Sequence, residues 1–201
     1  MWRRLLALLG VRTAATVRAE GLADRAAIGA HAEKATGAQL WKLETRGWQV
    51  FHGRHIPGGR ADLDHVLVPP DGTAVIILDT KAWHAAWYTQ LKHGRLHCGT
   101  QDRHGQVEAV AGYARRVQMA LGMPGVAVVP LVVVHGSQVR GAKGEYLEAP
   151  VDGGGRVFVL GIDRLVPELI RASKGIDSDA ACRLAARVQE VLPPHPGSGV
   201  R

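Results

Sequence analysis

Residues 61–81, ADLDHVLVPPDGTAVIILDTK, decide how this chain folds. Two apolar runs, 62–68 and 73–80, are joined by Pro-Pro-Asp-Gly. This pattern predicts a β-hairpin with Pro70 and Gly72 at the second and fourth positions of a type I turn. Each run also carries charged residues, and an unpaired carboxylate in a buried strand costs several kcal/mol. The direction in which these side chains point therefore bears on function as well as on fold.

The register of the hairpin sets the positions of its carboxylates. A four-residue connection predicts that Asp64 faces Ile77 and that Asp62 faces Asp79. Because side chains alternate between the two faces of a strand, Asp64, Asp79 and Lys81 share one face. Asp64 and Asp79 are then diagonal neighbours, about 7 Å apart at the backbone and within joint reach of one ion.

Two carboxylates this close repel each other unless one is protonated or a cation lies between them. Oxygen ligands suit a hard ion such as Mg²⁺ or Mn²⁺. Lys81 adds a positive group that could hold or deprotonate a water, or stabilise charge that develops on a phosphate. The Asp-x-Lys triplet alone is open to a simpler interpretation, an exposed strand end with a surface Asp–Lys pair, and Asp64 in the matching strand favours the metal site.

A third carboxylate is a candidate for the same site. Glu33, on a predicted helix, shares its face with Ala30, Gly37 and Leu40. Small residues there would let the helix approach the sheet and direct Glu33 inward. The alternative is a half-exposed helical glutamate.

The pattern of the whole chain predicts one α/β (α+β) domain with a mixed sheet. A helix over 22–46 precedes a strand (48–53) and the hairpin, and a second hairpin turns at His93-Gly94. The apolar run 126–134 is typical of a central strand covered on both faces. Beyond these elements we expect a helix over 105–122, a strand over 156–162 and helices over 163–173 and 177–192. The domain then spans 22–192, between an amphipathic or disordered lead-in (1–21) and a disordered tail (193–201).

The composition favours a soluble protein with a polyanionic partner. The chain has 201 residues, of which 46% are apolar and 21% charged, and its formal net charge is +7. Its two cysteines indicate a reduced, cytoplasmic protein, and the opening MWRRLLALLG is too short to span a bilayer. A basic excess is compatible with nucleic acid, an anionic membrane surface or a merely solvated face. The candidates for contact with nucleic acid are Arg60, Lys92, Arg95, Arg103, Arg115 and Arg116.

Histidine pairs give no support for zinc. His93 with His97, and His52 with His55, have suitable spacing, but they fall on predicted strands and loops. His65 should point to the face opposite Asp64, where a packed or hydrogen-bonded histidine is expected.

Four segments of the chain carry a family resemblance: GAHAEKAT (29–36), GWQVFHGRHIPGGRADLDHVLV (47–68), GTAVIILDTKAW (72–83) and GRL (94–96). Together they resemble the nuclease-related domain family (NERD), a branch of the PD-(D/E)xK, restriction-endonuclease-like superfamily. The resemblance covers roughly residues 27–135. It implies an α-β-β-β-α-β core and metal-dependent cleavage of DNA.

The resemblance also implies site residues. Glu33 matches the glutamate of the family's Gly-Ala-x-Gly-Glu stretch, and Asp64 matches the aspartate of its Ile-Asp-His segment. Asp79 and Lys81 match its acidic-x-Lys signature, while Gln106 matches a glutamine near the site.

Two positions depart from the family pattern. Ala32 replaces a glycine, and AWHAAW (82–87) lacks the glycine that commonly follows the Lys motif.

The leading functional prediction is a Mg²⁺- or Mn²⁺-dependent nuclease that acts on DNA and needs no small-molecule cofactor. One alternative is a nuclease-like fold that holds nucleic acid on its basic face without cutting it. A second is a membrane-peripheral or signalling domain anchored by MWRRLLALLG.

Overall fold

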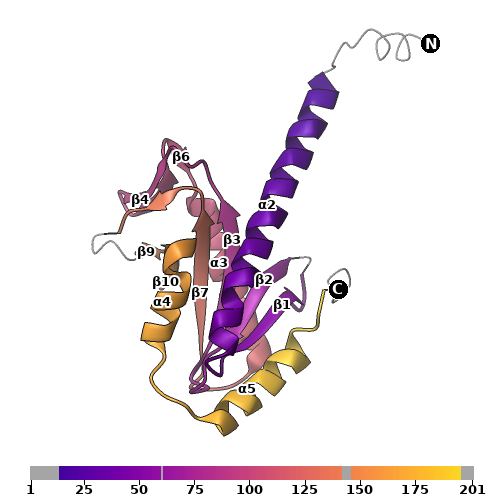
Figure 1. Ribbon diagram of the computed structural model, residues 1–201, viewed down its shortest axis with the longest axis vertical. Helices are drawn as coiled ribbons and strands as arrows, with labels where there is room; N and C mark the ends of the chain where they lie inside the picture. The colour runs from indigo at the N-terminus through magenta and orange to yellow at the C-terminus, as the bar shows by residue number, and fades with distance from the viewer. Residues whose placement is uncertain (1–13, 60, 142–145, 196–201) are drawn as a thin grey trace, which may run out of the picture.

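The computed structural model describes residues 14–59, 61–141 and 146–195 (Figure 1). Its α+β fold is built on a six-stranded sheet with the strand order β1-β2-β3-β7-β10-β9. Strands β3, β7 and β10 run parallel to one another, and the other neighbours are antiparallel. The predicted mixed sheet is confirmed. Its strands are β1 (Gln49–His55), β2 (Asp62–Val68), β3 (Ala74–Ala82), β7 (Ala127–His135), β9 (Leu147–Pro150) and β10 (Arg156–Gly161).

Helices cover both faces of this sheet. α2 (Ala14–Glu44) and α4 (Ile162–Ala172) pack on one face, and α3 (His104–Leu121) and α5 (Ser178–Val191) pack on the other. Strand β7 contributes alternate residues to both layers and is central, as its continuous apolar run predicts. The order α2-β1-β2-β3, followed by α3 and β7, confirms the expected α-β-β-β-α-β core.

Helix α2 is longer than predicted. It already runs from Ala14, so residues 14–21 belong to the helix rather than to the lead-in, while residues 1–13, with MWRRLLALLG, lie outside the described part. In Figure 1 its N-terminal half extends beyond the sheet, and residues 22–31 are exposed. Its C-terminal half buries a stripe at helical spacing, which fastens the helix to the sheet. The stripe consists of Ala32, Thr36, Leu40 and Leu43.

A second, four-stranded sheet lies between β3 and α3 in the sequence and recruits β8. It consists of β4 (Tyr88–Lys92), β5 (Arg95–Cys98), β6 (Gln101–Asp102) and β8 (Gln138–Val139). The predicted turn at His93-Gly94 is confirmed, and both residues have positive φ, 51° and 77°, as a type I′ turn requires. No helix in the described ranges is both long and apolar enough to cross a membrane.

The β2–β3 hairpin has the predicted turn but a different register. The Gly72 N–H donates to the Pro69 carbonyl at 2.9 Å, which closes the turn. The strands, however, pair Val66 with Ile77, a shift of two residues from the predicted register. A shift of two keeps every side chain on its face. Continued along the strands, this register brings Asp64 directly opposite Asp79 instead of diagonal to it.

The connection before β3 is held by contacts to the segment between α4 and α5. The Asp177 N–H donates to the Pro70 carbonyl at 2.8 Å, and the Asp71 carboxylate accepts from the N–H groups of Thr73 and Lys174. These contacts hold Thr73 out of the ladder, so β3 begins one residue later, at Ala74.

Residues 193–195, assigned above to a disordered tail, lie along β1. The His55 N–H donates to the Pro193 carbonyl at 2.9 Å, and the His195 N–H donates to the Gly53 carbonyl at 2.8 Å. Arg54 and Pro194 form an antiparallel bridge between them. Residues 196–201 lie outside the described part.

Candidate active site

Asp64 lies where the pairing of β2 with β3 ends. The last paired residues are His65 and Leu78. Beyond them the Asp64 carboxylate accepts a hydrogen bond from the Thr80 backbone N–H at 2.6 Å. A side-chain oxygen thus takes the position that a strand carbonyl would have in a continued ladder, and it links Asp64 directly to the segment 79–81.

Asp79 and Lys81 lie on the same face of β3, two residues apart. Their partners on β7, Val132 and Val134, belong to the core layer under α3. The Lys81 Nζ lies 2.6 Å from Oδ2 of Asp79, and the two side chains are only 28% and 13% exposed. The ammonium group therefore partly neutralises a carboxylate that the fold has largely removed from water.

Both carboxylates have raised pKa values, because burial disfavours their charged forms. The pKa of Asp64 is raised to about 7, first by burial and then by the Asp79 carboxylate, with a smaller contribution from Glu33. The Thr80 N–H and Lys81 oppose this rise. Burial also raises the pKa of Asp79, against the effect of Lys81. Such clustering of perturbed carboxylates is a feature of functional sites.

Glu33 lies on α2, which packs on the face of the sheet opposite to the one that carries Asp79 and Lys81. It is half-buried on the flank of the buried stripe, next to Ala32, whereas Ala30, which was expected to share its inward face, is exposed. At Gly37, a Cβ atom would lie 3.5 Å from the His65 ring, so the small residue does allow a close approach to the sheet. Its charge contributes to the raised pKa of Asp64, but less than burial and the Asp79 carboxylate do.

Gln106 lies in the first turn of α3. Its Oε1 is buried and has no hydrogen-bond partner among the residues that the structure describes. The structure shows no hydrogen bond between Gln106 and the carboxylates in this part of the chain.

The donor chemistry of this group fits a divalent cation. Carboxylate oxygens are the ligands that Mg²⁺ and Mn²⁺ prefer, and the raised pKa values of Asp64 and Asp79 mark a place where positive charge is favourable. Among the described residues, however, Glu33, Asp64 and Asp79 do not bring three oxygens within 4.8 Å of one another. Joint ligation therefore requires side-chain movement, and the Lys81–Asp79 ion pair is one contact that would have to give way.

A different cluster of potential metal ligands is more closely spaced, and it was not predicted from the sequence. Ligand atoms of His55, Asp62 and His195 all lie within 4.8 Å of one another. His55 was considered only with His52, which instead contacts His65 through the Nδ1 atoms at 2.7 Å. The cross-strand position of Asp62 could have pointed to His55, but nothing local in the sequence predicts the approach of His195.

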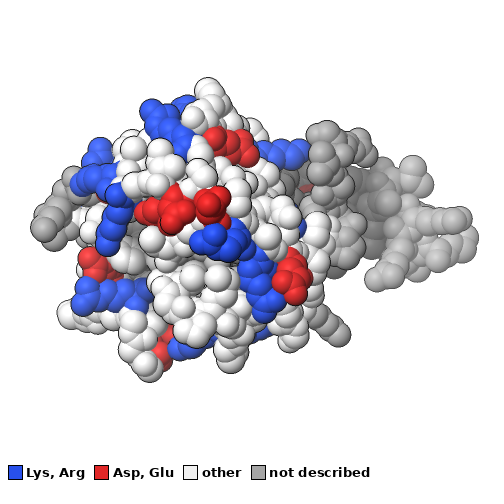
Figure 2. Space-filling model, turned by 90° about the horizontal axis from the view of Figure 1, so that it is seen from below, with Lys and Arg blue, Asp and Glu red and all other residues white. Residues whose placement is uncertain are grey.

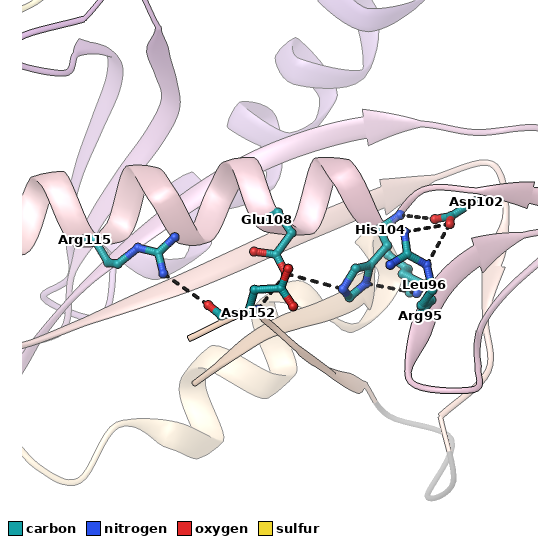
Figure 3. A network of polar contacts seen from close by, with 7 residues as sticks. All are labelled: Arg95, Leu96, Asp102, His104, Glu108, Arg115 and Asp152. Atoms are coloured by element: carbon teal, nitrogen blue, oxygen red, sulfur yellow. Dashed lines mark hydrogen bonds and ion pairs between the residues drawn. The ribbon is translucent and has the colours of Figure 1, made fainter. Parts of the chain in front are cut away.

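The basic candidates take part in structural contacts. In Figure 3, Arg95 pairs with Asp102 and Arg115 donates to the Asp152 carbonyl, at 2.8 and 3.4 Å. Both belong to a network along α3 that continues through His104 and Glu108. These two arginines remain exposed, so their outer faces stay accessible.

The other basic candidates are more strongly engaged. Lys92 donates to the Gly99 carbonyl at 3.0 Å, Arg103 lies over the Trp83 ring, and Arg116 donates to the Pro57 carbonyl at 2.8 Å. Arg60 lies outside the described residues. On the face of the molecule drawn in Figure 2, Lys and Arg side chains are interspersed with Asp and Glu and form no single continuous basic patch.

Comparison with known proteins adds one match. The family model described as NERD, nuclease-related domain, matches residues 28–135. No curated protein and no solved structure matches the chain. The matched range contains Glu33, Asp64, Asp79, Lys81 and Gln106.

Proposed function

The chain belongs to the nuclease-related domain family, and on that premise we propose that it is a Mg²⁺- or Mn²⁺-dependent nuclease that hydrolyses phosphodiester bonds in DNA. One observation carries this proposal. Two largely buried carboxylates on neighbouring strands have raised pKa values, and a lysine lies against one of them. A fold gains no stability from such an arrangement, which makes a chemical role the better explanation.

Each residue has a distinct role in this proposal. Asp64 and Asp79 would hold the divalent ion, and Glu33 would join them from α2. A bound ion would supply Lewis-acid chemistry to the phosphate and would lower the pKa of a water. The Thr80 N–H orients the Asp64 carboxylate. Gln106 would accept a hydrogen bond from the attacking water once its Oε1, which is buried in this structure, turns toward the site.

Lys81 acts at the phosphate in this scheme. Once its ammonium leaves Asp79, it donates to a non-bridging phosphate oxygen or to the attacking water, where negative charge develops in the transition state. Water adds to phosphorus, the bond to the leaving oxygen breaks, and the products are a phosphomonoester and a free hydroxyl group.

The competing function is a module that holds nucleic acid without cutting it. The net charge of +7 favours this alternative, because phosphate contacts alone give sequence-independent binding. A pure binder, however, gains nothing from two buried carboxylates facing a phosphate.

We also place the protein in the cytoplasm, where its free cysteines Cys98 and Cys182 stay reduced.

Cleavage assays separate these two functions. Supercoiled plasmid and single-stranded DNA are incubated with the full chain in Mg²⁺, Mn²⁺ or EDTA, next to Asp79→Asn. Nicking or shortening of DNA that needs the metal and the aspartate supports the nuclease. Binding of DNA without cleavage in any divalent metal supports the binding module.

A further inference from the structure

Two imidazoles and one carboxylate converge at the outer edge of the main sheet. The Nδ1 of His55 lies 3.0 Å from Oδ1 of Asp62, and the Nδ1 of His195 lies 3.0 Å from Oδ2 of the same carboxylate. One ligand atom from each of the three residues lies within 4.8 Å of the other two. This is the most closely spaced group of potential metal ligands in the described part of the chain.

Main-chain structure brings the three side chains together. His55 and Asp62 are directly paired across β1 and β2, so two of the donors are fixed by a rigid ladder. His195 arrives on an extended segment whose backbone is hydrogen-bonded to β1 on both sides of the Arg54–Pro194 bridge. The main chain of His195 is thus held next to β1 by these contacts.

The donor set selects the class of ion. Imidazole nitrogen with carboxylate oxygen suits Zn²⁺ and similar transition metals, whereas Mg²⁺ prefers oxygen donors. Zinc binds such atoms at about 2.1 Å, so tetrahedral ligands lie about 3.4 Å apart, close to the spacing seen here. The three side chains are 36%, 34% and 45% exposed, which leaves room for a water ligand. The single carboxylate charge partly balances the charge of a divalent ion.

We propose that His55, Asp62 and His195 form a zinc site that fastens the C-terminal segment 193–195 to strand β1. In this position the segment covers the otherwise unpaired edge of the six-stranded sheet, where β1 is the outermost strand. The site is separate from the carboxylates Asp64 and Asp79, and it does not depend on nuclease activity.

The test uses the full chain freed of metal with EDTA. Zinc binding is measured by calorimetry, and binding of Co²⁺ by its visible absorption spectrum, which reports the ligands. The His55 and His195 amides donate hydrogen bonds to the Pro193 and Gly53 carbonyls. Their rates of hydrogen exchange report whether the segment 193–195 stays paired with β1. The variants are Asp62→Asn and His195→Ala. The control is His84→Ala, an exposed histidine in a turn.

The proposal expects stoichiometric zinc uptake and slower exchange of both amides in zinc than in EDTA. The zinc bound at this site and the slower amide exchange should be lost in Asp62→Asn and His195→Ala and kept in His84→Ala. Equal zinc uptake by the wild type and both site variants would overturn it. Amide exchange that is identical in zinc and EDTA would also overturn it, because Asp62 would then serve only as a hydrogen-bond acceptor for two histidines.

Discussion

Asp64 accepts a hydrogen bond from the backbone N–H of Thr80 at 2.6 Å, at the point where β2 and β3 stop pairing. Thr80 lies between Asp79 and Lys81, so this one contact ties the upstream aspartate to the acidic-x-Lys segment. The fold therefore holds two carboxylates together at an electrostatic cost, which the raised pKa values of both groups express.

This cost predicts how stability depends on pH when no metal is present. Asp64 keeps its proton to about pH 7 in the folded chain and loses it near pH 3.8 when unfolded. The folded state thus binds more protons between these values, so stability falls as pH rises through this window. Asp64→Asn removes this penalty, which reaches up to about 4 kcal/mol above pH 7. Urea unfolding in EDTA from about pH 4 to about pH 8 measures it.

Two comparisons isolate the effect of Asp64. The pKa of His65 is lowered to about 4 by burial and by His52, which destabilises the fold toward acid, but His65 is present in both proteins and cancels in their difference. Asp24→Asn, on the exposed part of α2, makes the same charge change, and its free energy of unfolding should depend on pH as that of the wild type does. If the free energy of unfolding of Asp64→Asn also follows the wild-type pH dependence, the Asp64 carboxylate does not destabilise the fold.

Metal should stabilise the wild type more than an Asp79 variant. An ion that binds only the folded state raises its stability by mass action, by about 2.7 kcal/mol at a hundred times the dissociation constant. Asp79→Asn removes one ligand charge, so its melting temperature should rise less in Mg²⁺ or Mn²⁺ relative to EDTA. Asp24→Asn should respond like the wild type. Equal shifts in the wild type and Asp79→Asn would exclude Asp79 as a ligand.

Lys81 should act in catalysis more than in binding. An interaction that strengthens only in the transition state changes the rate without much change in affinity. We expect Lys81→Ala to lower the cleavage rate roughly 10²-fold or more and to leave the dissociation constant for DNA nearly unchanged. Lys92→Ala, whose lysine donates to the Gly99 carbonyl, should keep the wild-type rate. Normal cleavage by Lys81→Ala would refute the proposed role.

The sequence predicts which face each carboxylate occupies because that depends only on alternation along a strand. It does not predict the two-residue shift that places Asp64 opposite Asp79, since the connection is held by Asp71 and by contacts to Asp177, far along the chain. Turn-type preferences depend only on the four residues of the turn and take no account of the structure against which the turn packs.

The same limit applies elsewhere in the site. The small residue Gly37 was read correctly as a point of close helix–sheet approach, but the buried stripe of α2 runs through Ala32 and Thr36 rather than through Ala30. Helical spacing fixes which residues share a face and not how that face is rotated toward the sheet. His195 could not be assigned at all, because its position depends on strand-like pairing of the tail.

Thr36 should hold α2 against the two strands next to the site. It is fully buried, accepts from the Thr80 hydroxyl at 3.2 Å and contacts the His135 Nε2 at 2.8 Å. Thr36→Val keeps the volume but leaves both partners without this hydroxyl, which should lower the free energy of unfolding by about 1–3 kcal/mol. Thr45→Val, at an exposed helix end, is the matched control. Urea unfolding that shows no difference between the two variants would contradict this role.

Arg115 and Arg116, adjacent on α3, should differ in their effects. The Arg116 guanidinium is half-buried and donates to the Ile56 and Pro57 carbonyls, so Arg116→Ala leaves these acceptors unpaired and loosens the loop before β2. We expect a loss of about 1–3 kcal/mol in the free energy of unfolding. Arg115 is exposed and makes one long contact, at 3.4 Å to Asp152. Arg115→Ala should leave stability within about 0.5 kcal/mol.

Binding to DNA across a salt series completes the comparison of these two arginines. If Arg115 contacts phosphate, Arg115→Ala should bind more weakly and its affinity should depend less on salt, because fewer counterions are released. Gly59→Ala provides an independent route to the Arg116 effect, since the added Cβ would meet the Arg116 guanidinium and displace it without removing the charge. An unchanged salt dependence in Arg115→Ala, together with a loss of stability as large as that of Arg116→Ala, would show that both arginines are structural.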